Sequence, residues 1–108
     1  MDENLKKIKE IIVQTAKEMN IEIDRIILFG SRARGDYRED SDYDLLIVTK
    51  NKLNEIQKRN FVILVHKTLV KNFQEGFDII VVDKQYFEKY RDVYGCIVGI
   101  ANLEGIII

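Results

Sequence analysis

The segment YDLLIV at residues 43–48 restricts the fold more strongly than any other part of the sequence. From residue 45 to residue 48 every side chain is aliphatic, at odd and at even positions alike. Because successive side chains of a strand point to opposite faces of a sheet, a strand here needs apolar cover on both faces. Two further short apolar runs, RIILF at residues 25–29 and FDIIVV at residues 77–82, indicate two more strands. The sequence therefore predicts a small sheet covered by helices.

Two segments outside these strands, one before the first and one between the second and third, have the spacing of helices. Residues 4–19 predict an amphipathic helix that ends at Asn20. Its apolar stripe consists of Leu5, Ile8, Ile12, Ala16 and Met19. Residues 53–73 predict a second helix, and its dense FVILV centre predicts deep burial. The helical spacing there continues through Leu53, Ile56, Asn60, Ile63 or Leu64, and Val70.

Glycines and polar residues mark the remaining boundaries. Gly76 is expected to break the chain before the third strand, and residues 84–104 are mostly helical with a break near Gly95. Residues 31–41 are polar, lack periodicity and predict a loop. The apolar tail, residues 106–108, is expected to add an edge strand or to form a contact surface. The order α-β-loop-β-α-β-α favours an α/β or α+β fold, with a small mixed sheet flanked by helices.

Length and charge narrow the class of protein. A chain of 108 residues that is 46% hydrophobic can bury one core, so we expect a single domain over residues 1–108. The formal net charge of −1 argues against direct binding of nucleic acid or of an anionic membrane. The lone Cys96 excludes a disulfide within the chain and a Cys-rich zinc site. With no secretory signal and no apolar run near the roughly 20 residues that span a bilayer, we expect a cytoplasmic protein.

Two carboxylates stand at the start of the second predicted strand. Asp42 and Asp44 are two residues apart, so a strand would direct both to the same face. Their like charges repel unless a cation lies between them. Hard oxygen ligands of this kind are what Mg²⁺ uses, usually together with substrate phosphates. An Asp-x-Asp pair by itself is also common at a solvated strand end.

A glycine–serine turn follows the first predicted strand. Gly30 allows a strained turn and close approach of the backbone to a ligand, and Ser31 could cap a short helix or donate to a phosphate oxygen. Arg32 and Arg34 come just downstream. Either could offset the charge of a triphosphate, or form a structural ion pair with Asp36 or Asp40.

A third acid, Asp78, opens the third predicted strand among apolar residues. We expect this strand to lie inside the sheet, where a charge is costly unless it is paired or metal-bound. If this strand lies beside the second, Asp78 completes a three-carboxylate site for two metal ions. The simpler interpretation is an aspartate at an exposed edge.

Taken together, these residues resemble a known signature. Gly30-Ser31, ten intervening residues and then Asp42-Tyr43-Asp44 resemble the GS-x10-DxD motif of the DNA polymerase β-like nucleotidyltransferase superfamily. The fuller pattern, GSRARG followed by SDYDLLIV, resembles the minimal nucleotidyltransferases of archaea and bacteria, over essentially the whole chain. The resemblance implies the polymerase β-like fold. It also implies that Gly30 and Ser31 contact the nucleotide phosphates.

The resemblance implies a catalytic and a biological role as well. Asp42 and Asp44 would bind Mg²⁺, and Asp78 would match the third carboxylate, with a general-base role open to it. Many minimal nucleotidyltransferases are encoded beside a HEPN-domain protein in pairs that resemble toxin–antitoxin modules. There the nucleotidyltransferase acts as the antitoxin and transfers AMP from ATP to a tyrosine of the HEPN RNase toxin. We therefore expect a Mg²⁺-dependent protein adenylyltransferase with two metal ions, ATP as substrate and a HEPN-domain partner.

Two other functions are kept beside this one. The domain could neutralise a partner by occlusion without catalysis, or it could transfer a nucleotidyl group to RNA or to a small molecule. His66 is expected to be a helical surface residue rather than a ligand, because no second His or Cys accompanies it. Cys96 is expected to be a small core residue rather than a nucleophile.

Overall fold

A four-stranded mixed sheet forms the centre of the molecule. The computed structural model describes residues 3–108. The elements in chain order are α1 (Glu3–Glu18), β1 (Ile23–Phe29), α2 (Ser31–Arg34), β2 (Tyr43–Thr49), α3 (Glu55–Asn72), β3 (Phe77–Asp83), α4 (Lys84–Tyr90), α5 (Ile97–Glu104) and β4 (Ile106–Ile107). The strand order is β3-β2-β1-β4. Strand β1 is antiparallel to β2 and β4, whereas β2 and β3 are parallel.

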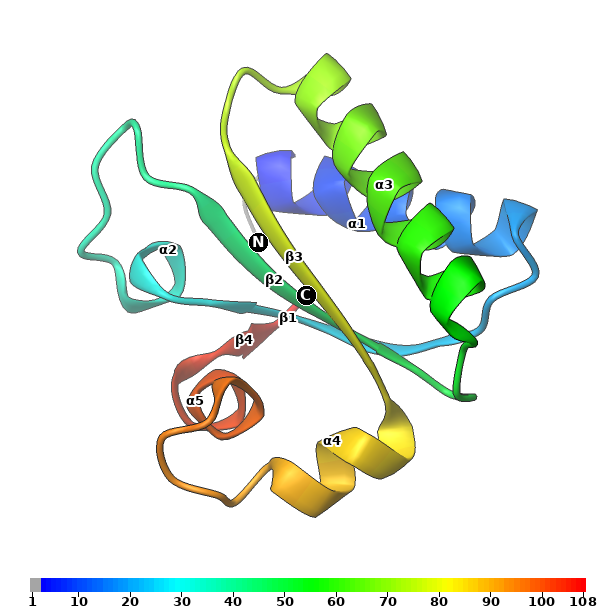
Figure 1. Cartoon of the computed structure of the whole chain (residues 1–108). Helices are drawn as coiled ribbons and strands as arrows, with labels where there is room; N and C mark the ends of the chain where they lie inside the picture. The colour runs from blue at the N-terminus through cyan, green and yellow to red at the C-terminus, as the bar shows by residue number, and fades with distance from the viewer. Residues whose placement is uncertain (1–2) are drawn as a thin grey trace.

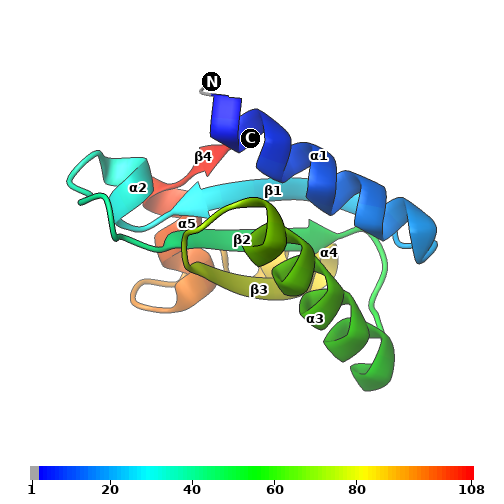
Figure 2. The same cartoon turned by 90° about the horizontal axis from the view of Figure 1, so that it is seen from above.

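Helices cover both faces of this sheet, as the sequence predicted. Helices α1 and α3 lie on one face, and α4 and α5 lie on the other (Figure 1). Along β2, Leu45 and Ile47 pack in the core beneath α1 and α3, whereas Leu46 and Val48 pack beneath α4 and α5. Figure 2 shows the sheet from the side of α3, with the strands following one another in the order β4, β1, β2 and β3. The fold class is therefore confirmed, and β2 is buried on both sides of the sheet.

Several predicted boundaries are confirmed by backbone geometry. Asn20 adopts a φ of 57° after α1, the left-handed conformation that ends many helices. Asn54 begins α3 by accepting a 2.8 Å hydrogen bond from the Gln57 amide. The apolar tail does form an edge strand, because Ile107 pairs with Ile27 of β1. No helix within residues 3–108 is long and apolar enough to cross a membrane.

The predicted buried face of α3 is wrong. The helix buries Phe61, Val65 and Leu69, which are spaced by four residues. The alternative stripe is exposed: Ile56, Ile63, Leu64 and Val70. Because α3 is apolar on more than one side, spacing alone could not choose the face that meets the sheet. His66 lies exposed on this helix, as expected.

The predicted loop at 31–41 and the predicted interior position of β3 also need correction. The loop begins with one helical turn, α2, whose N-cap is Gly30 and carries no side-chain cap, so Ser31 does not cap it. Strand β3 lies at the edge of the sheet, and Asp78 on it is exposed. Cys96 is half-buried, and its sulfur accepts a 3.3 Å hydrogen bond from Gly99 at the start of α5.

Candidate active site

The glycine–serine turn lies between β1 and α2, beside the second aspartate of the sequence motif. Gly30 has φ 73° and ψ −158°, a conformation that is essentially restricted to glycine. A Cβ atom placed at Gly30 would overlap the carboxylate of Asp44. The Gly30 carbonyl accepts hydrogen bonds from the amides of Ala33 and Arg34, which fixes the helical turn that follows. The backbone at Gly30 is thereby held next to a carboxylate.

The sheet register brings the predicted acids together. Strand β2 lies beside β3 in parallel register, so Asp44 stands directly opposite Asp78. Both share a strand parity with residues that pack beneath α4 and α5, which places them on that face of the sheet. Asp42 lies just before β2 begins, and a Cβ atom at Gly76 would overlap its carboxylate. Asp44 is half-buried, whereas Asp42 and Asp78 are exposed.

The electrostatics of Asp44 reflect this crowding. Its pKa is raised above the ordinary value of 3.8, first by burial and then by the nearby negative charge of Asp78. A hydrogen bond to Asp78 and the charge of Asp42 raise the pKa of Asp44 further, while the charge of Arg34 lowers it. An ionised Asp44 is therefore held under repulsion from two other carboxylates.

The donor set fits a hard divalent cation. Carboxylate oxygen atoms are the ligands that Mg²⁺ prefers, and the repulsion felt by Asp44 is what a cation would relieve. Within residues 3–108, however, no three His, Cys, Asp or Glu side chains already stand together as a metal-binding group. The acids converge, but their side chains do not form a closed set of ligands.

Arg32 is engaged with the loop that leads to Asp42. Its guanidinium donates hydrogen bonds to the Ser41 carbonyl at 2.9 and 3.1 Å and to the Glu39 carbonyl at 3.2 Å. The same group lies over the ring of Tyr43, 4.2 Å from the centroid, and over the ring of Tyr37 at 4.6 Å. These contacts hold the loop against the start of β2. Contact of Arg32 with a nucleotide stays a prediction.

Arg34 lies between two carboxylates. Its Nε is 3.3 Å from Asp36, and its Nη1 is 3.1 Å from Glu104 of α5. Hydrogen bonding to Asp36, the charge of Asp36 and the more weakly felt Glu104 raise the pKa of Arg34 above its usual value. The pairing with Asp36 is one that the sequence had suggested, whereas Glu104 was not foreseen.

Two site residues escaped the sequence argument. Glu104 accepts a 3.2 Å hydrogen bond from the Gly30 amide across 74 residues of chain, and no local motif marks it. Gly76 was expected only as a helix breaker, although it also gives Asp42 the room that it occupies. The one sequence signal for this role is that Gly76 and Asp78 are two residues apart, the same spacing as Asp42 and Asp44 on the neighbouring strand.

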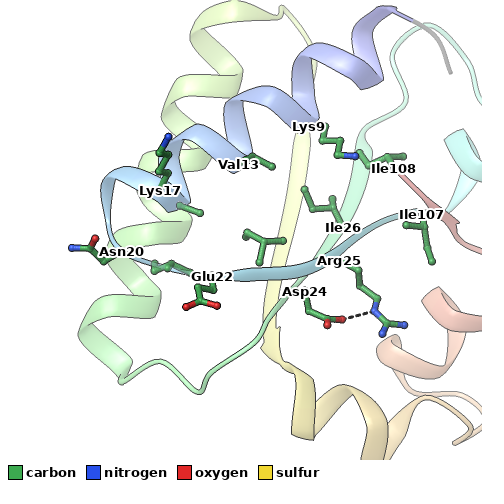
Figure 3. Close-up of a pocket in the computed structure, with 13 residues that line it drawn as sticks. Lys9, Val13, Lys17, Asn20, Glu22, Asp24, Arg25, Ile26, Ile107 and Ile108 are labelled. Carbon is green, nitrogen blue, oxygen red and sulfur yellow. Dashed lines mark hydrogen bonds and ion pairs between the residues drawn. The ribbon is translucent and has the colours of Figure 1, made fainter.

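A separate cavity lies away from these residues. A groove of about 760 Å³ runs between α1, the first half of β1 and the tail at Ile107 and Ile108 (Figure 3). Lys9 and Val13 line its helical side. None of the acids or glycines of the candidate site lines this groove. The candidate site is instead an open surface at the other end of β1.

Comparison with known proteins identifies a family and relatives of this chain. The profile of the family described as "Nucleotidyltransferase domain" matches residues 5–99. The chain is 35% identical over 79 residues to a protein of Methanocaldococcus jannaschii named "Putative protein adenylyltransferase MJ0141", covering 69% of this chain and 75% of that one. A second protein of the same organism, "Putative protein adenylyltransferase MJ0604", is 54% identical over 43 residues, which are 40% of this chain and 43% of that one.

Two solved structures share the fold. A crystal structure described as a "putative nucleotidyltransferase from Sulfolobus solfataricus" superposes with a TM-score of 0.56 at 22% identity, over 96% of this chain and 80% of that one. The crystal structure described as "the toxin-antitoxin with AMP-PNP" superposes with a TM-score of 0.51 at 14% identity, over 91% of this chain and 69% of that one. At these identities the two structures establish likeness of fold alone.

Proposed function

Because the chain belongs to the nucleotidyltransferase domain family, we propose that it transfers AMP from ATP to a tyrosine hydroxyl of a partner protein, with Mg²⁺ as cofactor. The proposed partner is a HEPN-domain RNase toxin, and the chain would act as its antitoxin. The names of the two archaeal relatives support protein as the acceptor. The toxin–antitoxin description of one structural neighbour supports a partner protein.

One observation carries this proposal. The register of β2 against β3 sets Asp44 opposite Asp78, and Asp44 lies against the glycine turn that leads into α2. A triphosphate and a divalent cation need clustered carboxylates beside backbone amides that can approach phosphate closely. The same surface provides both.

Each residue has a role that follows from its position. The turn at Gly30 and Ser31 would bind the phosphates, with Arg34 beside it. Asp42, Asp44 and Asp78 would hold Mg²⁺, which when bound neutralises charge on the carboxylates and on the triphosphate. The acceptor oxygen forms a bond to the α-phosphorus as the bond to pyrophosphate breaks. Asp78 is exposed on the edge strand, and we propose that it accepts the proton of the acceptor hydroxyl.

We place the proposed partner surface on the outer face of α5. This helix has no charged residue before Glu104, and its exposed side chains recur every three residues at Ile97, Ile100 and Leu103. Leu103 is 81% exposed. A helix that is apolar on its outer as well as its inner face favours burial against another surface. Because Glu104 contacts the Gly30 amide, a partner on α5 would lie beside the candidate site.

Label transfer tests the proposal directly. The chain is incubated with ATP labelled at the α-phosphate, Mg²⁺ and a HEPN-domain RNase, and the labelled residue is identified by mass spectrometry. We expect label on a partner tyrosine, loss of transfer in EDTA, and loss of transfer in the double variant Asp42→Asn, Asp44→Asn. Wild-type turnover by a folded double variant would rule out the proposed metal site.

The same experiment separates the other acceptors and the occluding role. Label on RNA or on a small molecule, with none on the partner, would replace protein adenylylation by another transfer. Neutralisation of the toxin by the folded double variant, without any label, would favour occlusion. ATP affinity unchanged by EDTA, measured by calorimetry, would contradict the role of Mg²⁺.

A further inference from the structure

The carboxylate of Glu104 occupies the donors that the proposed function assigns to phosphate. One oxygen atom, Oε1, accepts hydrogen bonds from the Gly30 amide at 3.2 Å and from Arg34 Nη1 at 3.1 Å. Glu104 is the last residue of α5, and its side chain is 26% exposed. The end of this helix therefore reaches back to the turn after β1.

These two donors are suited to an anion. A backbone amide in a glycine turn and a guanidinium are both groups that bind phosphate oxygen atoms in proteins. Gly30 is fixed in a conformation that other residues rarely adopt, which directs its amide toward the end of α5. The chain fills this anion position with a carboxylate of its own.

Two carboxylates balance the positive charge of Arg34. Asp36 and Glu104 lie on either side of its guanidinium, at 3.3 and 3.1 Å. A phosphate that approaches Arg34 from the side of Gly30 meets the charge of Glu104 first, because Glu104 contacts both groups whereas Asp36 contacts Arg34. Removal of this charge would remove the repulsion that a phosphate meets at these two donors.

We propose that Glu104 competes with the triphosphate of the nucleotide for the Gly30 amide and Arg34, so that nucleotide binding displaces the end of α5. This inference rests on the proposed function, because it takes these two donors as phosphate ligands. Glu104 would then lower the affinity for nucleotide, although no sequence motif marks it.

The variant Glu104→Gln tests the competition. Its amide oxygen can still accept from the Gly30 amide, but the negative charge is gone. Dissociation constants for ATP with Mg²⁺ and for inorganic tripolyphosphate are measured by calorimetry, with the Gly30 amide followed by NMR. We expect Glu104→Gln to bind both probes about three- to fivefold more tightly, the range that one partly exposed ion pair supports. The gain should shrink in 0.5 M salt.

Two further variants make the outcome specific. Asp40→Asn removes one negative charge from the loop between α2 and β2, and Asp40 makes no ion pair with any of residues 3–108. It should change affinity much less than Glu104→Gln. In an Arg34→Gln background, the gain from Glu104→Gln should fall, because one of the two contested donors is absent.

The possible results distinguish the inference from the proposed function. Equal or weaker binding of both probes by a folded Glu104→Gln would overturn the competition, even if the wild type binds ATP. An equal gain in affinity from Asp40→Asn would overturn the competition as well, because the effect would then come from net charge alone. Tighter binding of tripolyphosphate by Glu104→Gln with a shifted NMR signal of the Gly30 amide, but no nucleotidyl transfer, would support the competition and reject the proposed function. No binding of either probe by any variant would overturn both.

Discussion

Gly30→Ala and Gly76→Ala form a matched pair, because each new Cβ atom would overlap an aspartate carboxylate of the candidate site. Only Gly30 has a left-handed φ, and its φ of 73° with ψ of −158° costs a non-glycine residue about 1–3 kcal/mol. Replacing glycine by alanine also stiffens the unfolded chain, which returns about 0.4–1 kcal/mol. We therefore expect Gly30→Ala to lower the free energy of unfolding by about 1–2 kcal/mol, before any cost of moving the half-buried Asp44.

Gly76→Ala should behave differently. Its backbone lies outside the left-handed region, and the overlapping group is the end of the exposed Asp42 side chain, which can rotate away. We expect unfolding free energy within about 0.5 kcal/mol of the wild type, but weaker Mg²⁺-dependent ATP binding because the Asp42 carboxylate is displaced.

Urea unfolding followed by circular dichroism at 25 °C measures both variants, with the slope against urea as a check that the compactness of the two states is unchanged. The loss in Gly30→Ala should also lower Tm by about 4 °C or more. Gly30→Ala as stable as the wild type, or Gly76→Ala less stable than Gly30→Ala, would refute the reasoning from backbone conformation.

Asp44→Asn should stabilise the chain at pH 7, because the raised pKa of Asp44 means that its ionised form costs folding free energy. The gain in stability should fade as the pH falls toward 3.8. Equal gains at pH 7 and pH 4 in urea unfolding would contradict this. Asp78→Ala should lower single-turnover transfer by orders of magnitude with little change in ATP affinity or in Tm, since Asp78 makes no ion pair with any of residues 3–108; normal turnover would discard its catalytic role. Arg32→Lys should cost about 1–2 kcal/mol of stability through the lost bonds to loop carbonyls, and unchanged urea unfolding would exclude that loop-holding role. Leu103→Glu should abolish labelling of the partner and leave calorimetric ATP affinity intact, whereas full labelling would move the partner surface away from α5.

The local parts of this protein could be predicted from the chain alone. An aliphatic run on both parities at residues 45–48 required cover on both faces, because side chains of a strand alternate. The spacing of Ile8, Ile12 and Ala16 was enough to place one face of α1 in the core. Glycine and aspartate at fixed spacing marked the candidate site, since turns and carboxylate pairs are short-range features.

Which surfaces meet was decided by the tertiary structure. Helix α3 offers two apolar stripes, and only contact with the sheet selects Phe61 and Val65 over Ile56 and Ile63. The edge position of Asp78 follows from the pairing order of the strands, to which its own neighbours give no clue.

The sequence by itself determined the main helices and strands other than α2, the double-sided burial of β2 and the identity of the paired acids, because each depends on residues within one strand, turn or helix. The tertiary structure decided that Asp44 faces Asp78, that Gly76 makes room for Asp42 and that Glu104 reaches the Gly30 amide. These are contacts between residues 34 to 74 positions apart, which periodicity and local turn chemistry do not specify. They arise only when strand register and helix packing bring distant parts of the chain to one surface.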